Sequence, residues 1–140
     1  MNVENAVLPR QEQISGLLEM GGDSPIVMLN LLKFHDQARY DDPSEPAISG
    51  REAYMRYGVP MGALVTASGG RMMFSAQVNA LVIGEVDELW DMAAIVEYPN
   101  RAAFVAIATS PEVQAISHHR KAGLAGQLLI QCTAMPDAGG

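Results

Sequence analysis

The chain has 140 residues and a mass of 15.0 kDa, which is enough for one domain with its own hydrophobic core and too little for two. Sixteen acidic and nine basic residues give a net charge of −7, which argues against binding to nucleic acid or to an anionic membrane surface. Apolar residues make up 49% and charged residues only 18%, so little polar surface is left to cover a monomer, and we expect self-association.

The cellular setting follows from features that the sequence lacks. The single cysteine, Cys132, excludes an internal disulfide. The N-terminus has no basic region followed by an apolar stretch, and no run approaches the roughly 18 apolar residues of a membrane-spanning helix. We therefore expect a soluble, cytoplasmic protein.

The first half of the chain predicts a short helix, a buried strand and a long helix. Residues 10–20 carry apolar side chains at helical spacing, and residues 26–34 are almost continuously apolar, as in a strand buried on both faces. A polar, proline-rich loop follows. The next helix is expected from about Ser49 to Ser68, with a kink or restart at Pro60 because proline removes a backbone donor.

The second half of the chain predicts strands on both sides of a two-part helix. In chain order, the expected elements are strands at 71–77 and 80–84 with a bend at Asn79, a strand at 89–98, helical pieces at 99–109 and 111–121, and a strand at 127–134. Pro99 is expected to open the first helical piece. Ser110 is expected to cap the second piece, with Pro111 just inside it.

The order of these elements is a helix followed by β-α-β-β-α-β. This is the split βαβ, or ferredoxin-like, arrangement of an α+β protein, with helices on one face of an antiparallel sheet. The main domain is then expected at residues 25–134, after an N-terminal helical extension (1–24) and before a tail (135–140).

Side-chain alternation gives the central strands two faces that are both mainly apolar. Helices cover only one face, and exposing the other costs about 1.5–3 kcal/mol per large apolar side chain, so we expect a homodimer closed sheet on sheet. Charges are costly beneath a helix layer, which assigns the face with Lys33, Asp91 and Glu97 to the dimer seam. Asn30 and Trp90 then lie under the helices, with Asn30 as one polar side chain in an apolar layer.

Short strings along residues 25–133 carry a family resemblance through their order and spacing. These strings are Asn30-Leu31-Leu32-Lys33-Phe34, Tyr54 with Tyr57, Gly69-Gly70-Arg71, Trp90-Asp91, Glu97-Tyr98-Pro99, Ser110-Pro111 and Arg120-Lys121-Ala122-Gly123-Leu124. The chain resembles the domain-of-unknown-function family 1330 of the dimeric α/β-barrel superfamily. The resemblance implies two ferredoxin-like protomers packed sheet to sheet, with a site between each sheet and its helices. Superfamily relatives include cofactor-free monooxygenases, an isomerase and haem-dependent or haem-degrading enzymes, whereas the family itself has no agreed reaction.

Four side chains are expected to form the body of a binding site at that place. Asn30 either orients a ligand or satisfies a backbone group of the fold. Trp90 either stacks on a planar ligand or belongs to the core. Tyr54 and Tyr57 lie at positions i and i+3 of one helix and either offer a phenol to a pocket or pack against the sheet.

The last helix adds His118 and Arg120 to these candidates. Adjacent residues such as His118 and His119 lie about 100° apart on a helix, so they do not bind one metal from one face, and we predict no metal site. His118 is a candidate to move a proton, although the run of basic residues at this end of the helix also complements the helix dipole. Arg120 either binds a substrate carboxylate or pairs with Glu97 or Glu112. The candidate catalytic residues are His118, Tyr57 and Asn30, and the candidate substrate-binding residues are Asn30, Trp90, Tyr54, Tyr57 and Arg120.

Three functions remain open. The first is a homodimer that binds a small apolar or aromatic molecule between sheet and helices and acts without a cofactor, as an oxygenase or isomerase. The second is a non-catalytic dimeric module for binding or assembly. The third is a haem-binding or haem-degrading protein, which the absence of tryptophan from residues 102–121 disfavours.

Overall fold

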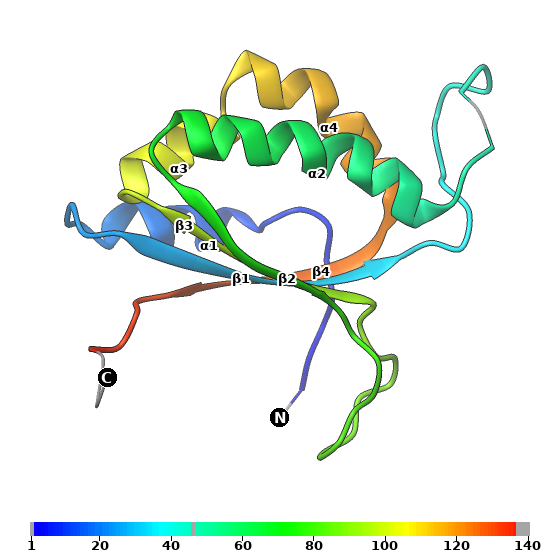
Figure 1. Cartoon of the computed structure of the whole chain (residues 1–140), viewed down its shortest axis with the longest axis horizontal. Helices are drawn as coiled ribbons and strands as arrows, with labels where there is room; N and C mark the ends of the chain where they lie inside the picture. The colour runs from blue at the N-terminus through cyan, green and yellow to red at the C-terminus, as the bar shows by residue number, and fades with distance from the viewer. Residues whose placement is uncertain (1, 46, 137–140) are drawn as a thin grey trace.

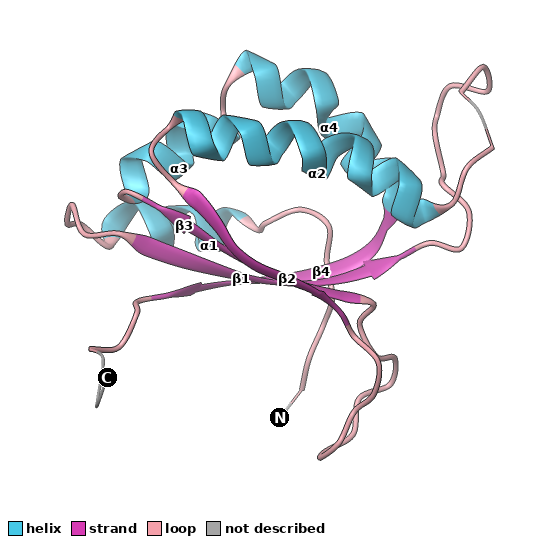
Figure 2. Cartoon of the chain, in the orientation of Figure 1, coloured by secondary structure: helices cyan, strands magenta, loops and turns pink. Residues whose placement is uncertain are grey.

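The computed structural model describes residues 2–45 and 47–136. Its elements in chain order are α1 (Gln11–Glu19), β1 (Ile26–Phe34), α2 (Gly50–Ala67), β2 (Arg71–Gln77), β3 (Met92–Tyr98), α3 (Arg101–Ala108), α4 (Pro111–Gly123) and β4 (Leu124–Cys132). The sheet has the order β2-β3-β1-β4 with antiparallel neighbours, and α2, α3 and α4 cover one of its faces (Figures 1 and 2). The predicted ferredoxin-like α+β fold is confirmed. In the described residues no helix is long and apolar enough to cross a membrane.

Side-chain caps set where the helices begin. Ser49 accepts a hydrogen bond from the Glu52 backbone at the start of α2, and Ser110 accepts one from the Val113 backbone at the start of α4, as predicted for Ser110. Asn100 does the same for α3, so this helix begins at Arg101 rather than at Pro99. A capping amide placed one residue after the proline explains the difference.

Helix α2 continues through Pro60 as one helix, so the expected restart does not occur. Pro60 and Val59 are both exposed, which places the proline on the outer side of the helix. Water can therefore hydrate the carbonyl of Arg56, which loses its usual backbone donor.

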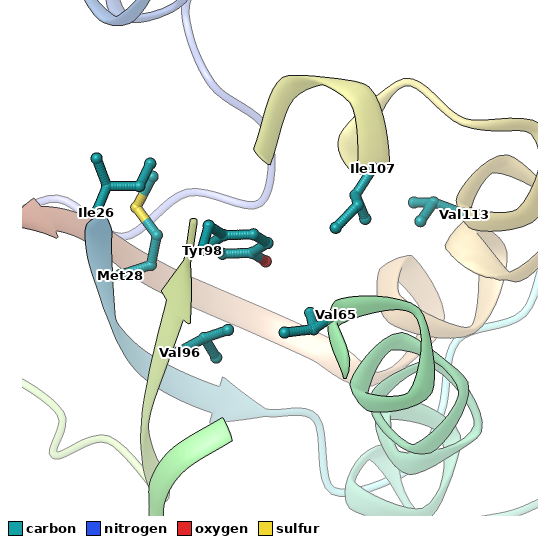
Figure 3. Close-up of a cluster of buried hydrophobic side chains, with 7 residues drawn as sticks. All are labelled: Ile26, Met28, Val65, Val96, Tyr98, Ile107 and Val113. Carbon is teal, nitrogen blue, oxygen red and sulfur yellow. The ribbon is translucent and has the colours of Figure 1, made fainter. Parts of the chain in front are cut away.

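The core lies between the sheet and the helices. Figure 3 shows its larger cluster, which joins two central strands to the three covering helices and consists of Ile26, Met28, Val65, Val96, Tyr98, Ile107 and Val113. Leu32, Phe34 and Leu124 form a second buried cluster further along β1. These residues confirm that the face of β1 shared by Met28, Leu32 and Asn30 is the one under the helices.

The opposite sheet face has no helix over it (Figure 1). Strand pairing places a set of apolar side chains on this open face, none of them fully buried: Leu29, Leu31, Phe74, Ile95, Leu128 and Ile130. Phe74 is 54% exposed. Lys33 and Asp91, whose charges were assigned to this face, form an ion pair at 3.5 Å.

The expected strand at 80–84 and the expected strand start at Leu89 are both wrong. The β2–β3 ladder ends where the Val78 backbone N–H donates to the Asp91 carbonyl (2.9 Å), and the chain between them is a loop. Val82 and Ile83 are each 89% exposed in this loop, which projects beyond the open face of the sheet (Figure 1). Their β-branched side chains favour a strand, but no neighbouring strand is available to pair with them.

The last strand begins earlier than expected, at Leu124 instead of Gln127, because α4 runs through Gly123 directly into β4 without a loop. Met135 and Pro136 follow β4 outside any strand. The rest of the expected tail, 137–140, lies outside the described residues.

Candidate functional site

A chain of polar side chains crosses the layer between sheet and helices at Asn30. The Asn30 amide donates to the carbonyls of Met28 (3.3 Å) and Ala94 (3.4 Å). Its Oδ1 accepts a hydrogen bond from Nε2 of Gln127 (3.0 Å), and Oε1 of Gln127 accepts one from the Arg120 guanidinium. The polar residue that sequence parity places in an apolar layer is therefore linked to a charged residue of α4.

The direct connection from α4 into β4 brings Arg120 and Gln127 together. Arg120 lies in the last turn of α4, and Gln127 pairs with Leu32 of β1 on the helix-facing side of the sheet. Between them, Gly123 lies against the first turns of α2. A Cβ atom at Gly123 would collide with the Gly50 carbonyl and lie 2.8 Å from the backbone nitrogen of Tyr54. This close crossing places Tyr54 near Arg120.

Replacing Gly123 with alanine tests this crossing. The added methyl group meets backbone atoms that cannot rotate away, so we expect the free energy of unfolding to fall by about 1–3 kcal/mol. Gly58→Ala is the matched control, because its Cβ would make only an ordinary 3.5 Å contact with the Tyr54 ring. Urea denaturation of both variants measures the effect, and equal stability of the two would contradict the tight crossing.

Two tyrosines of α2, Tyr54 and Tyr57, lie within reach of the Arg120 charge, and Tyr98 of β3 lies near them. The rings of Tyr54 and Tyr57 have centroids 5.6 Å apart, and Tyr54 also contacts the Phe34 ring at 5.4 Å. Figure 3 shows the Tyr98 hydroxyl directed from β3 toward the helices. Among residues 2–45 and 47–136, none of these three hydroxyls is a fully buried polar atom left without a partner.

Burial between sheet and helices changes the acidity of all three phenols, because it disfavours their charged form. Burial raises the pKa of Tyr54, and the charge that Tyr57 would carry raises it further, whereas Arg120 lowers it. Burial also raises the pKa of Tyr57, again opposed by Arg120. For Tyr98, burial and then the charges on Tyr57 and Tyr54 all raise the pKa. All three phenols therefore stay neutral at physiological pH and act as hydrogen-bond donors.

These raised pKa values predict a loss of stability in alkaline solution. A phenol whose pKa is higher in the folded chain does not make the free energy of unfolding depend on pH below the unfolded value of about 10, because both states hold the proton there. Above that pH the unfolded chain releases protons that the folded chain keeps, so stability falls by up to about 1.4 kcal/mol per pH unit for each phenol. Urea unfolding between about pH 9 and pH 11 should show this fall, and Tyr54→Phe should reduce its slope. An unchanged slope in that variant would show that Tyr54 ionises as easily in the folded chain as in the unfolded chain.

Arg120 supplies the positive charge of this group. Within the described part of the chain it belongs to no ion pair, and Glu97, one of its expected partners, binds Arg71 at 3.2 Å instead. The neighbours that the structure gives Arg120 are the Gln127 amide and the neutral phenols of Tyr54 and Tyr57. The group therefore offers one cation and several donors to a negatively charged molecule.

His118, a predicted catalytic residue, faces away from this group. Its side chain is 54% exposed, and Nε2 lies 4.0 Å from a carboxylate oxygen of Glu45 in the loop after β1. Neighbouring His119 lies with Nδ1 2.6 Å from the Tyr40 hydroxyl, and burial, followed by the charges of His118 and Arg56, lowers its pKa. Sequence spacing does not show which face of α4 packs against the sheet. In the structure, both histidines lie on the face toward the loop after β1.

Trp90, a predicted ligand-stacking residue, also lies elsewhere. It precedes β3, so strand alternation does not extend to it, and its indole N–H donates to Oδ1 of Asn5 at 2.7 Å. Sequence reasoning missed Gln127 and Tyr98. Both are polar groups on the helix-facing side of predicted strands, the signal that singled out Asn30.

In residues 2–45 and 47–136, no three His, Cys, Asp or Glu side chains gather to hold a metal ion. Two hollows of about 500 and 560 Å³ lie on loops, at residues 81–87 and 35–39. Neither is lined by the residues around Arg120.

The fold and this interior group define a ferredoxin-like α+β protein with hydrogen-bond donors between sheet and helices. The model of the family described as "Domain of unknown function (DUF1330)" matches residues 44–132, and the chain belongs to this family. A protein of unknown function from Rhodopseudomonas palustris is similar to it, with 31% identity over 94% of this chain and 98% of that chain and a TM-score of 0.85.

More distant solved structures share the fold alone. SnoaB, a cofactor-independent oxygenase from Streptomyces nogalater, is 11% identical with a TM-score of 0.54, over 84% of this chain and 99% of that chain. A hydroxynitrile lyase from Passiflora edulis is 8% identical with a TM-score of 0.52, over the same shares, 84% and 99%. A search among curated proteins finds no match.

Proposed function

We propose that this protein binds a small, planar organic acid between its sheet and helices and stabilises negative charge on it. The observation that carries the proposal is the half-buried Arg120 guanidinium, which forms no ion pair in the described residues and lies near the neutral phenols of Tyr54 and Tyr57. Apolar walls with a few convergent polar groups are typical of small-molecule sites. Phe34 and the tyrosine rings supply such walls.

The donors favour reactions that pass through an oxyanion. Arg120 and the neutral hydroxyls of Tyr54, Tyr57 and Tyr98 would donate to an enolate or phenolate oxygen and lower the energy of that anion. Oxygenation and isomerisation without a cofactor both use such an anion, so we propose one of these reaction types. SnoaB supports the oxygenase only by analogy of fold.

The open sheet face supports a homodimer as the working form. Six apolar side chains share that face, and water is a costly neighbour for them. A second copy presents the same apolar surface, so closing the two sheets face to face removes both from water.

Isothermal titration calorimetry tests the binding proposal. Hydroxybenzoates and hydroxynaphthoates are titrated beside their uncharged amides, which have the same shape. We expect the acids to bind about tenfold more tightly or better, the range of a hydrogen bond to a charged group. Arg120→Gln should remove this preference, whereas Arg56→Gln, a change of an exposed arginine near Glu45, should keep it. Equal binding of acids and amides, or no binding of either, would contradict the proposal.

A further inference from the structure

We propose that residues 5–7 form a strap along β4 that positions Gln127 for ligand binding, and that Trp90 anchors this strap. The inference rests on the proposed function only for its effect on the ligand. It gives Trp90 a role that does not require contact with the ligand.

The first contact of the strap is with the backbone of Gln127. The Ala6 N–H donates to the Gln127 carbonyl at 3.2 Å, and the two residues form an antiparallel bridge. Figure 1 shows the N-terminal segment passing beside β4. Val7, the next residue, packs against the buried cluster that contains Leu32 and Leu124.

The second contact is made by Asn5. Its Oδ1 accepts the indole hydrogen bond of Trp90 at 2.7 Å. Its side chain also occupies the space beside Gly126, where an added Cβ would lie only 2.6 Å from the Cβ of Asn5. Residue 126 must therefore be glycine for the strap to lie this close to β4.

Gln127 is consequently held on both its backbone and its side chain. The strap binds its carbonyl, while Arg120 and Asn30 bind its amide. β4 is an edge strand of the sheet, and the backbone groups of an edge strand are free to move or to pair elsewhere. Releasing the strap therefore lets β4 shift at residues 126–127, which misdirects the amide that orients Arg120.

Two substitutions release the strap by different means. Asn5→Ala removes the acceptor for Trp90. Gly126→Ala keeps both the Asn5 amide and the Trp90 indole but pushes the Asn5 side chain away from β4. Asn5→Asp keeps an acceptor and should restore the contact. Glu4→Ala is the control, because Glu4 is exposed and forms no ion pair within the described residues. Trp90 is the only tryptophan, so fluorescence reports the anchor directly.

The expected results separate the strap from the ligand proposal. Both releasing variants should change the Trp90 emission and shift the NMR signal of the Gln127 side-chain amide, whereas Glu4→Ala and Asn5→Asp should leave both close to wild type. Affinity for 4-hydroxybenzoate should fall about fivefold in the releasing variants, the factor that one lost neutral hydrogen bond corresponds to. An unmoved Gln127 signal in Asn5→Ala would overturn the strap, whatever the ligand does. Shifted signals with no binding of 4-hydroxybenzoate by the wild type would keep the strap's positioning of Gln127 and contradict the proposed ligand instead.

Discussion

Leu29→Asp should convert a dimer into monomers. Leu29 lies in the middle of β1 on the open face, between Ile95 of β3 and Ile130 of β4. A carboxylate at the centre of a sheet-on-sheet interface would lose its hydration without gaining a partner, at a cost of several kcal/mol. Light scattering at micromolar concentration should report twice the chain mass of 15.0 kDa for the wild type and 15.0 kDa for the variant.

The control for this experiment is Val59→Asp. Val59 is 67% exposed on α2, on the far side of the helix layer from the open face, so its change should leave the dimer intact. A wild-type protein that is folded and monomeric at this concentration would contradict the dimer.

Asn30→Ala should abolish ligand binding and lower stability. The change removes the amide nitrogen that donates to the carbonyls of Met28 and Ala94, and the oxygen that accepts a hydrogen bond from the Gln127 amide. We expect the free energy of unfolding to fall by about 1–3 kcal/mol, and binding of the hydroxybenzoates to disappear because Gln127 no longer holds Arg120. Urea denaturation and calorimetry of the same sample measure the two effects.

The same variant separates a binding site from a structural network. The chain from Arg120 through Gln127 to Asn30 also satisfies its own polar groups, which is what a non-catalytic module would need. In that case Asn30→Ala would lose stability while any binding of the hydroxybenzoates stayed as in the wild type. Asn79→Ala, in the exposed loop after β2, controls for loss of an asparagine and should change neither quantity.

Much of the fold follows from local signals that tertiary contacts did not override. The apolar run at 26–34 became β1 with the expected bounds, since a strand paired on both sides needs little beyond β-branched and apolar residues. The segment 80–84 has the same local character but no neighbour to pair with, and it became a loop. Strand formation depends on such a partner, which a single segment does not reveal.

Part of the candidate site was predictable for a similar reason. Alternation placed Asn30 under the helices, and the i, i+3 spacing placed Tyr54 and Tyr57 on one helix face; the structure brings these residues near Arg120. The position of His118 depends on the rotation of α4, which packing decides.

Intermolecular NOEs between bound 4-hydroxybenzoate and the protein would show whether the ligand lies between sheet and helices, because they locate the ligand as well as detect it. We expect NOEs from the aromatic protons of the ligand to the ring protons of Tyr54 and Tyr57, and the loss of these NOEs in Arg120→Gln. NOEs confined to the loop hollows at residues 81–87 or 35–39, with none to the tyrosines, would contradict a site between sheet and helices.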